Sequence, residues 1–172
     1  MSTPSFVDAF SQQFTLDPAH TALLIIDMQN ATGNRHMGLG KLLAEQGNSD
    51  SAQYRFDRID DLLIPNIQKL IAGFRAAGAS IIWITYGANA QDASDAPPHI
   101  APIIKATNNI AGQPEHEVVD ALKPGPNDLV LNKTTQGAFR STGLDSALRA
   151  LGVTTVVSTG VSTNNCVAMT SM

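Results

Sequence analysis

The sequence contains a single cysteine, so a disulfide framework within the chain is excluded. No stretch approaches the roughly 18 consecutive apolar residues of a membrane span, and the first residues lack the basic-then-apolar pattern of a secretion signal. The 11 lysines and arginines are scattered through 172 residues of net charge −4, which leaves no basic surface for nucleic acid or an anionic membrane. We therefore expect one cytoplasmic domain over residues 1–172 that binds neither nucleic acid nor a membrane.

The chain does contain a regular alternation of short apolar runs with segments of helical spacing. The apolar runs predict four strands, at 22–28, 80–86, 128–133 and 153–157. Helical spacing predicts one helix that ends near Ala77 and another at 144–151. Helices between parallel strands imply right-handed crossovers. We therefore expect an α/β fold, a three-layer, doubly wound sandwich around a mainly parallel, Rossmann-like sheet.

Two polar stretches, 30–54 and 87–102, interrupt this alternation and predict long loops. The first contains several glycines and one short helical segment at 41–45, and a weak helical pattern lies at 115–122. Long loops in compact domains are usually functional. Because the first loop leaves the sheet beside Asp27, we expect it to lie near a site.

Three residues capable of chemistry stand where predicted strands end. Asp27 closes the first apolar run, Lys133 closes the third, and Cys166 follows the fourth, in the first turn of a predicted helix. The carboxyl ends of parallel strands meet at one edge of a sheet, where ligands of open α/β folds bind. An acid, a cation and a thiol at one edge support nucleophilic catalysis, with the ammonium and the helix N-terminus lowering the thiol pKa.

Each of these residues also has a purely structural interpretation. A lone aspartate or lysine at a strand end is most often a turn or surface residue. Free cysteine is among the most buried residue types, so Cys166 alone could equally be a core residue. Only the combination of the three positions favours a catalytic site.

Four segments resemble the isochorismatase-like cysteine hydrolases, a family that includes nicotinamidases, N-carbamoylsarcosine amidases and ureidoacrylate amidohydrolases. The matching segments occur in the family's order, at 24–30, 76–83, 133–139 and 160–167. The resemblance covers the chain from about Thr21 onward. It implies a catalytic triad at Asp27, Lys133 and Cys166.

The resemblance also implies a cis peptide bond between Val161 and Ser162. The backbone N–H groups of Ser162 and Cys166 would then form the oxyanion hole. The implied reaction is hydrolysis of a C–N bond in a small amide, carbamoyl or ureido compound through an acyl-enzyme, and the ureidoacrylate type is the most similar. Two alternatives stay open, a vinyl ether hydrolase of the isochorismatase type and a non-catalytic oligomeric or redox-responsive protein on the same fold.

Further residues are candidates for contacts with the substrate. Gln29 and Asn30 follow the acid, Tyr86 ends the second strand, and Phe139 matches an aromatic position of the family. No Asp-x-His pair, which builds the metal site of nicotinamidases in this family, occurs in the chain, so we expect neither a metal nor another cofactor. The expected partners are a small amide or ureide substrate and further copies of the chain in a homo-oligomer.

The family continues beyond its cysteine through the rest of a helix, a further strand and a closing helix. This sequence ends six residues after Cys166, at Met172. We therefore expect the sheet to lack the last strand and helix of the family.

Overall fold

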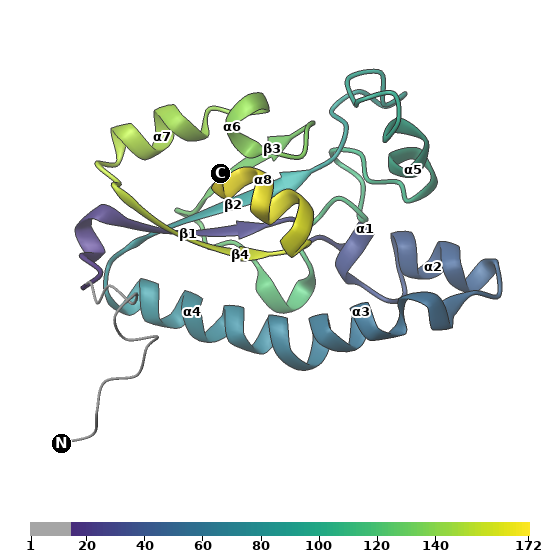
Figure 1. The fold of residues 1–172 in the computed structure, drawn as a ribbon, viewed down its shortest axis with the longest axis horizontal. Helices are drawn as coiled ribbons and strands as arrows, with labels where there is room; N and C mark the ends of the chain where they lie inside the picture. The colour runs from purple at the N-terminus through teal and green to yellow at the C-terminus, as the bar shows by residue number, and fades with distance from the viewer. Residues whose placement is uncertain (1–14) are drawn as a thin grey trace, which may run out of the picture.

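The computed structural model, which describes residues 15–172, contains a sheet of four parallel strands in the order β3-β2-β1-β4 (Figure 1). The apolar run of β1 lies at the centre and is buried along its whole length. This arrangement confirms the predicted α/β class and the parallel sheet. The strands are β1 (Thr21–Ile26), β2 (Ser80–Tyr86), β3 (Leu129–Lys133) and β4 (Thr155–Gly160).

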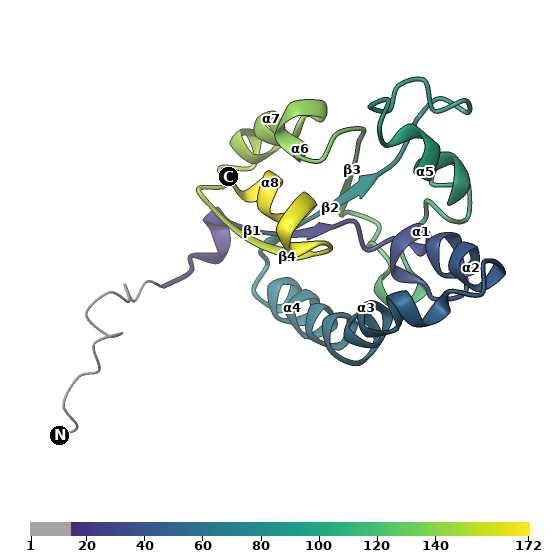
Figure 2. The same cartoon turned by 45° about the vertical axis from the view of Figure 1, so that its right-hand side comes forward.

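Helices cover both faces of the sheet, because alternate residues of β1 point to opposite sides. Leu23 and Ile25 pack in one cluster with Ile67 and Ile71 of α4 (Ile64–Ala76). The other face of β1 packs against α6 (Ala138–Ser141) and α7 (Leu144–Ala150). Figures 1 and 2 show these helices on opposite sides of the sheet, so the predicted three layers are present.

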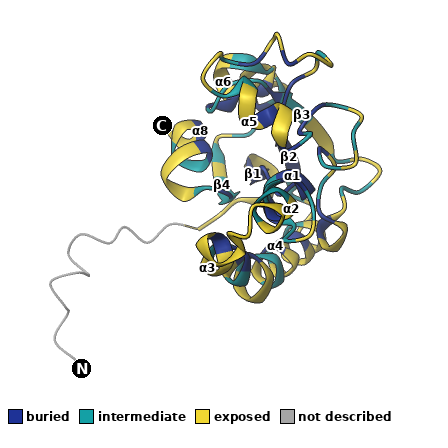
Figure 3. Cartoon of the chain, turned by 90° about the vertical axis from the view of Figure 1, so that its right-hand side faces the viewer, coloured by how far each residue is buried: buried dark blue, intermediate teal, exposed yellow. Residues whose placement is uncertain are grey.

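The buried residues gather between the two helix layers, and the outer sides of the helices are exposed (Figure 3). No helix in residues 15–172 has the length and apolar character needed to cross a membrane. The remaining α-helices are α1 (Asn30–Gly33), α2 (Gly38–Glu45), α3 (Gln53–Arg58), α5 (Ala101–Ala106) and α8 (Ala168–Ser171).

The predicted loop at 30–54 is wrong over most of its length, because α1, α2 and a 3-10 turn at Ser49–Ala52 occupy it. The glycines that indicated a loop allow close contact between backbones instead. A Cβ at Gly38, where φ is +44°, would collide with the carbonyl of Ala31, and one at Gly40 would collide with that of Arg35. The short helix expected at 41–45 is confirmed as part of α2.

The helix predicted to end near Ala77 ends at Ala76. It runs from α3 through a π-helical segment, Ile59–Leu63, directly into α4. By contrast, the weak helical pattern at 115–122 gives only one 3-10 turn, Asp120–Leu122. The α3 end of this continuous helix lies at the side of the molecule where the strands end, and α4 runs back below the sheet (Figure 1).

Candidate active site

Asp27 lies one residue beyond β1, at the carboxyl edge of the sheet. Its backbone turns into the left-handed region, with φ of +54°, while its N–H still donates to the carbonyl of Ile84 at 2.8 Å. This turn ends the strand before the predicted end at Met28. Non-glycine residues with such a backbone are uncommon and often stand at functional sites.

Lys133 is brought to Asp27 by the register of the sheet. It is the last residue of β3 and pairs with Tyr86 of β2, the strand beside β1. Its Nζ donates to Oδ2 of Asp27 at 2.9 Å, and both side chains are almost fully buried. The same Nζ lies 4.0 Å from the centre of the Tyr86 ring. The structure therefore places a buried ion pair at the point where the sequence predicted two separate strand ends to meet.

The second carboxylate oxygen of Asp27, Oδ1, is buried and has no hydrogen-bond partner among residues 15–172. Burial raises the pKa of Asp27, and the charge of Lys133 opposes this rise. A carboxylate with one oxygen held by an ammonium and the other unoccupied can accept a proton.

Cys166 lies in the π-helical turn Thr163–Val167 that follows β4. It is 7% exposed and packs in the cluster of the α6 and α7 face. Burial, followed by the negative charge of Asp27, raises the pKa of this thiol to about 12, while Lys133 acts in the opposite direction. The charges of Asp27 and Lys133 thus both act on the thiol.

The net lowering of the thiol pKa that we expected is contradicted. Burial and the neighbouring carboxylate outweigh the ammonium of Lys133. The resting thiol keeps its proton at neutral pH, and Asp27 beside it is the group that can remove that proton.

The segment between β4 and Cys166 makes a tight contact with the end of β1. The N–H of Val161 donates to the carbonyl of Ile26 at 3.0 Å. A side chain at Gly160, where φ is +118°, would collide with that same carbonyl. The peptide bond between Val161 and Ser162 is cis, at the position that the resemblance implied. The carbonyl of Ser162 then accepts from the N–H groups of Asn165 (3.0 Å) and Val167 (3.2 Å).

Comparison with known proteins agrees with this geometry. The sequence matches the isochorismatase domain over residues 21–172. The chain belongs to the isochorismatase family.

Two ureidoacrylate amidohydrolases named RutB are among the relatives of this isochorismatase-family chain. The protein from an Enterobacter species is 33% identical over 92% of the chain and 70% of its own length. The protein from Methylobacterium radiotolerans is 34% identical over 92% of the chain and 63% of its own length. The chain thus spans about two thirds of the length of these relatives.

Solved structures of the family have the same fold. A cysteine hydrolase from Pseudomonas syringae pv. phaseolicola gives a TM-score of 0.70 at 26% identity, over 99% of this chain and 70% of that one. An N-carbamoylsarcosine amidase from Thermoplasma acidophilum gives a TM-score of 0.60 at 25% identity, over 87% of this chain and 72% of that one.

Gln29 and Asn30, two predicted substrate contacts, are bonded to the protein itself. Gln29 has no exposed surface, and its Oε1 accepts from the N–H of Tyr86 at 2.7 Å. Its Nε2 donates to the carbonyls of Tyr86 (3.1 Å) and His116 (2.8 Å). Asn30 donates to the carbonyl of Pro114 at 3.0 Å. These amides join the end of β1 to β2 and to the following loop, so they position the site.

Tyr86 and Phe139, the other two predicted contacts, differ in their surroundings. The hydroxyl of Tyr86 is buried and has no hydrogen-bond partner within the described part of the chain. Burial, and then the charges of Cys166 and Asp27, raise the Tyr86 pKa to about 12, which places this side chain within the site. Phe139, on α6, is 45% exposed and lies on the surface.

Arg55 is a residue of the site that the sequence did not indicate. It projects from α3, and its Nη1 donates to Oγ of Ser162 at 3.0 Å. Arg55 and Ser162 also line a cavity of about 610 Å³ between α3 and the segment after β4. The missed signal is the helical spacing that continues back through Ile59 to Phe56, both of which are buried.

No group of three or more histidine, cysteine, aspartate or glutamate side chains that could hold a metal ion occurs in residues 15–172. His116, the buried histidine beside the site, contacts Oδ1 of Asn132 through Nε2 at 2.9 Å. Asn132 also bonds to the carbonyl of Gly87, so this cluster connects β3 to the end of β2.

Proposed function

We propose that this chain carries the catalytic centre of a hydrolase that cleaves a C–N bond in a small amide, carbamoyl or ureido compound, with Cys166 as the nucleophile. The observation that carries the proposal is the buried Asp27–Lys133 ion pair, whose unoccupied carboxylate oxygen stands in the same site as the only cysteine. The names of the relatives, ureidoacrylate amidohydrolase and N-carbamoylsarcosine amidase, support this class of substrate.

The first half of the reaction forms an acyl-enzyme. Asp27 takes the thiol proton as the sulfur of Cys166 attacks the substrate carbonyl carbon. The carbonyl oxygen becomes an oxyanion, and the N–H groups of Ser162 and Cys166 donate hydrogen bonds to it. The C–N bond then breaks, and Asp27 returns its proton to the leaving nitrogen.

The second half of the reaction releases the acid. Asp27 takes a proton from water, the resulting hydroxide attacks the thioester carbon, and the same two N–H groups hold the second oxyanion. The C–S bond breaks and the proton returns to sulfur, which restores the thiol. Lys133 stays bound to the carboxylate throughout, so it keeps Asp27 ionised between proton transfers and stabilises negative charge on sulfur.

Replacing Lys133 with methionine is expected to slow both turnover and alkylation of Cys166 by about tenfold or more. Without the ammonium, the charge of Asp27 acts on the thiol unopposed, so the thiol holds its proton more tightly. Lys133→Arg should recover only part of the rate, because a planar guanidinium does not fit the space of an ammonium above the Tyr86 ring.

The measurement is the rate of iodoacetamide labelling across pH, with Lys41→Met, an exposed lysine on α2, as the control for loss of a charge. An unchanged labelling profile in Lys133→Met would show that Lys133 does not affect the thiol and would refute the proposed triad.

The proposed function is tested by ammonia release from a panel of primary amides, carbamoyl amino acids and ureides. We expect release from at least one carbamoyl or ureido compound by the wild-type protein and none by Cys166→Ala. Hydrolysis of a vinyl ether substrate that survives the Cys166→Ala change would favour an isochorismatase-type reaction instead. Absence of turnover with every compound, in a folded protein, would contradict the proposal.

Turnover is expected to survive exhaustive dialysis against a chelator. The proposed mechanism assigns every proton transfer and charge to side chains or backbone of the chain, and the sequence lacks the Asp-x-His pair of the metal-containing relatives. The measurement compares the ammonia release rate before and after chelation, with zinc, iron or manganese added back. Activity that disappears on chelation and returns with one metal would show that the mechanism is incomplete.

A further inference from the structure

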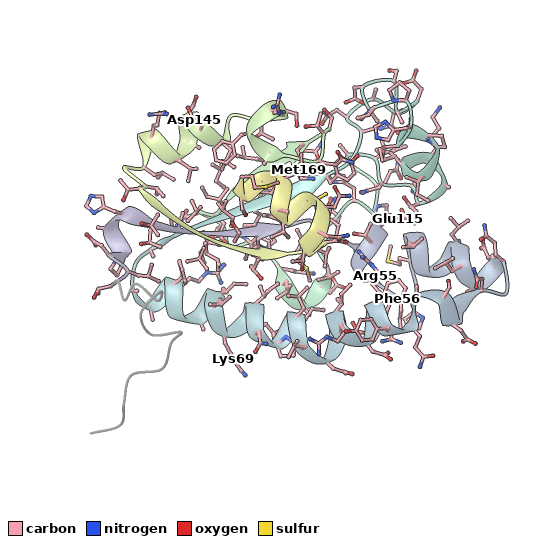
Figure 4. All side chains as sticks on the ribbon, viewed as in Figure 1. Arg55, Phe56, Lys69, Glu115, Asp145 and Met169 are labelled. Carbon is pink, nitrogen blue, oxygen red and sulfur yellow. The ribbon has the colours of Figure 1, made fainter. Side chains whose placement is uncertain are left out.

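Arg55 bridges two segments that are far apart in the sequence. Its Nε and Nη2 both donate to the carbonyl of Thr32, at 3.2 Å each, and its Nη1 donates to Oγ of Ser162 at 3.0 Å. Arg55 rises from α3 toward the C-terminal segment, and it is one of the side chains labelled in Figure 4. The guanidinium therefore holds α1 and the turn after β4 in one arrangement.

Each end of this bridge leads directly to a triad residue. On one side, Thr32 Oγ1 donates to the carbonyl of Asp27 at 3.4 Å, five residues earlier in the chain. On the other side, Ser162 accepts the N–H bonds that begin the helical turn of Cys166. A continuous series of contacts thus runs from the acid through Arg55 to the oxyanion donor and the nucleophile.

No carboxylate of the described residues balances the charge of Arg55. Its hydrogen bonds in residues 15–172 go to a carbonyl and a hydroxyl, and it forms no ion pair with any aspartate or glutamate of that region. By contrast, the nearby Arg35 forms ion pairs with both Asp57 and Asp60, so its charge is balanced by carboxylates. Burial lowers the pKa of Arg55, and a negative charge on Cys166 would raise it.

A half-buried guanidinium without a counter-ion is unfavourable in the resting protein. It becomes favourable when negative charge appears beside it. The reaction proposed above creates such charge twice, on the sulfur of Cys166 and on the oxyanion beside Ser162.

We propose that Arg55 is a positioning residue of the active site, which fixes Ser162 relative to Asp27 and stabilises the negative charge that develops at Cys166. This inference rests on the proposed function for its effect on turnover. Its effect on the thiol itself does not depend on knowing the substrate.

Arg55→Met is expected to lower kcat by about 10–100-fold with a smaller change in KM, less than the loss of a direct oxyanion donor because Arg55 acts through Ser162. The iodoacetamide labelling rate of Cys166 should fall several-fold in the same variant, because a cation near the thiolate is lost. Arg55→Lys should restore the labelling rate more than kcat, because it keeps the charge but lacks the planar fork that reaches Thr32 and Ser162 together. The control is Arg149→Met, which removes an exposed guanidinium on α7.

A change in thermal stability alone, with kcat and the labelling rate as in wild type, would overturn the proposal and leave Arg55 a structural residue. Equal behaviour of Arg55→Met and Arg149→Met would also overturn it. Ser162→Ala removes the acceptor of Arg55 and keeps the backbone N–H. It should reduce kcat, and adding Arg55→Met should then reduce kcat less than it does in wild type. Additive losses would show that Arg55 does not act through Ser162.

The labelling measurements keep this proposal separate from the proposed function. If no amide or ureide is hydrolysed by the wild-type protein but labelling slows in Arg55→Met, the function is wrong and the effect of Arg55 on the thiol stands. If turnover is found and neither kcat nor labelling responds to Arg55→Met, only the proposal about Arg55 fails.

Discussion

Replacement of Cys166 by alanine or serine is expected to abolish turnover, by at least about a thousandfold, while leaving the fold intact. The alanine variant has no nucleophile. In the serine variant the hydroxyl is far less acidic than a thiol, so neither Asp27 nor Lys133 can generate an alkoxide near neutral pH. The measurement is ammonia release at saturating substrate, accompanied by a thermal unfolding curve for each variant.

Both substitutions remove little volume from the α6 and α7 face, so we expect only a modest loss of stability, of about 1 kcal/mol. Serine retaining more than a few per cent of the wild-type rate would exclude covalent catalysis by this residue. Loss of turnover in a variant that has also lost its cooperative unfolding transition would reflect unfolding. The turnover of such a variant is therefore compared with that of the wild type at a temperature at which the variant is folded.

Asp27→Asn is expected to reduce turnover by about 10²–10⁴-fold and, at the same time, to make Cys166 more reactive toward iodoacetamide. The negative charge of Asp27 raises the thiol pKa, so a neutral amide removes that effect. Lys133 then faces the thiol without a carboxylate and lowers its pKa further. The labelling profile should therefore move to lower pH while hydrolysis is lost.

Comparison of Asp27→Asn with Lys133→Met separates an electrostatic effect on the thiol from a loss of folding stability. Each variant leaves one member of a buried ion pair unpaired, which costs about 3–5 kcal/mol of folding free energy. Both should therefore unfold at lower temperature, yet their labelling rates should change in opposite directions. A shared folding defect cannot produce opposite changes, so equal labelling in the two variants would refute the assigned contacts. Asp145→Asn, which removes an exposed carboxylate on α7, is the matched control.

The sheet and the contact between Asp27 and Lys133 could be predicted because they follow from local patterns. Each apolar run ends at a polar residue, and parallel strands place their ends at the same edge. Register then decides whether the side chains meet, and the pairing of Tyr86 with Lys133 does bring the ammonium to Asp27. The bounds of strands β1 to β4 match the predicted apolar runs to within a few residues.

Most of the helical structure in 30–54, apart from the segment at 41–45, could not be predicted, because glycine has two uses that look alike in a sequence. Glycine often marks a loop, but Gly38 and Gly40 allow α2 to approach the preceding backbone closely. Only the tertiary contact tells the two uses apart. Arg55 could not be singled out either, because its hydrogen bonds to Thr32 and Ser162 are also tertiary contacts.

The protonation state of the Cys166 thiol also could not be predicted from its own helical turn. The sequence placed Cys166 correctly in a helical turn after β4, and the helix N-terminus favours a thiolate. Burial and the charge on Asp27, which comes from another strand, raise the pKa and outweigh the opposing charge of Lys133. Gln29 shows the same limit, because its amide bonds to Tyr86 and His116, residues distant in sequence.

The most direct test of the central claim uses the fact that the chain has a single cysteine. The protein is titrated with iodoacetamide, and the fraction of Cys166 labelled, from intact mass, is compared with the remaining rate of ammonia release. The account predicts that activity falls in proportion to labelling, reaches zero at one label per chain, and is protected by substrate. Fully labelled protein that still hydrolyses the substrate would contradict it.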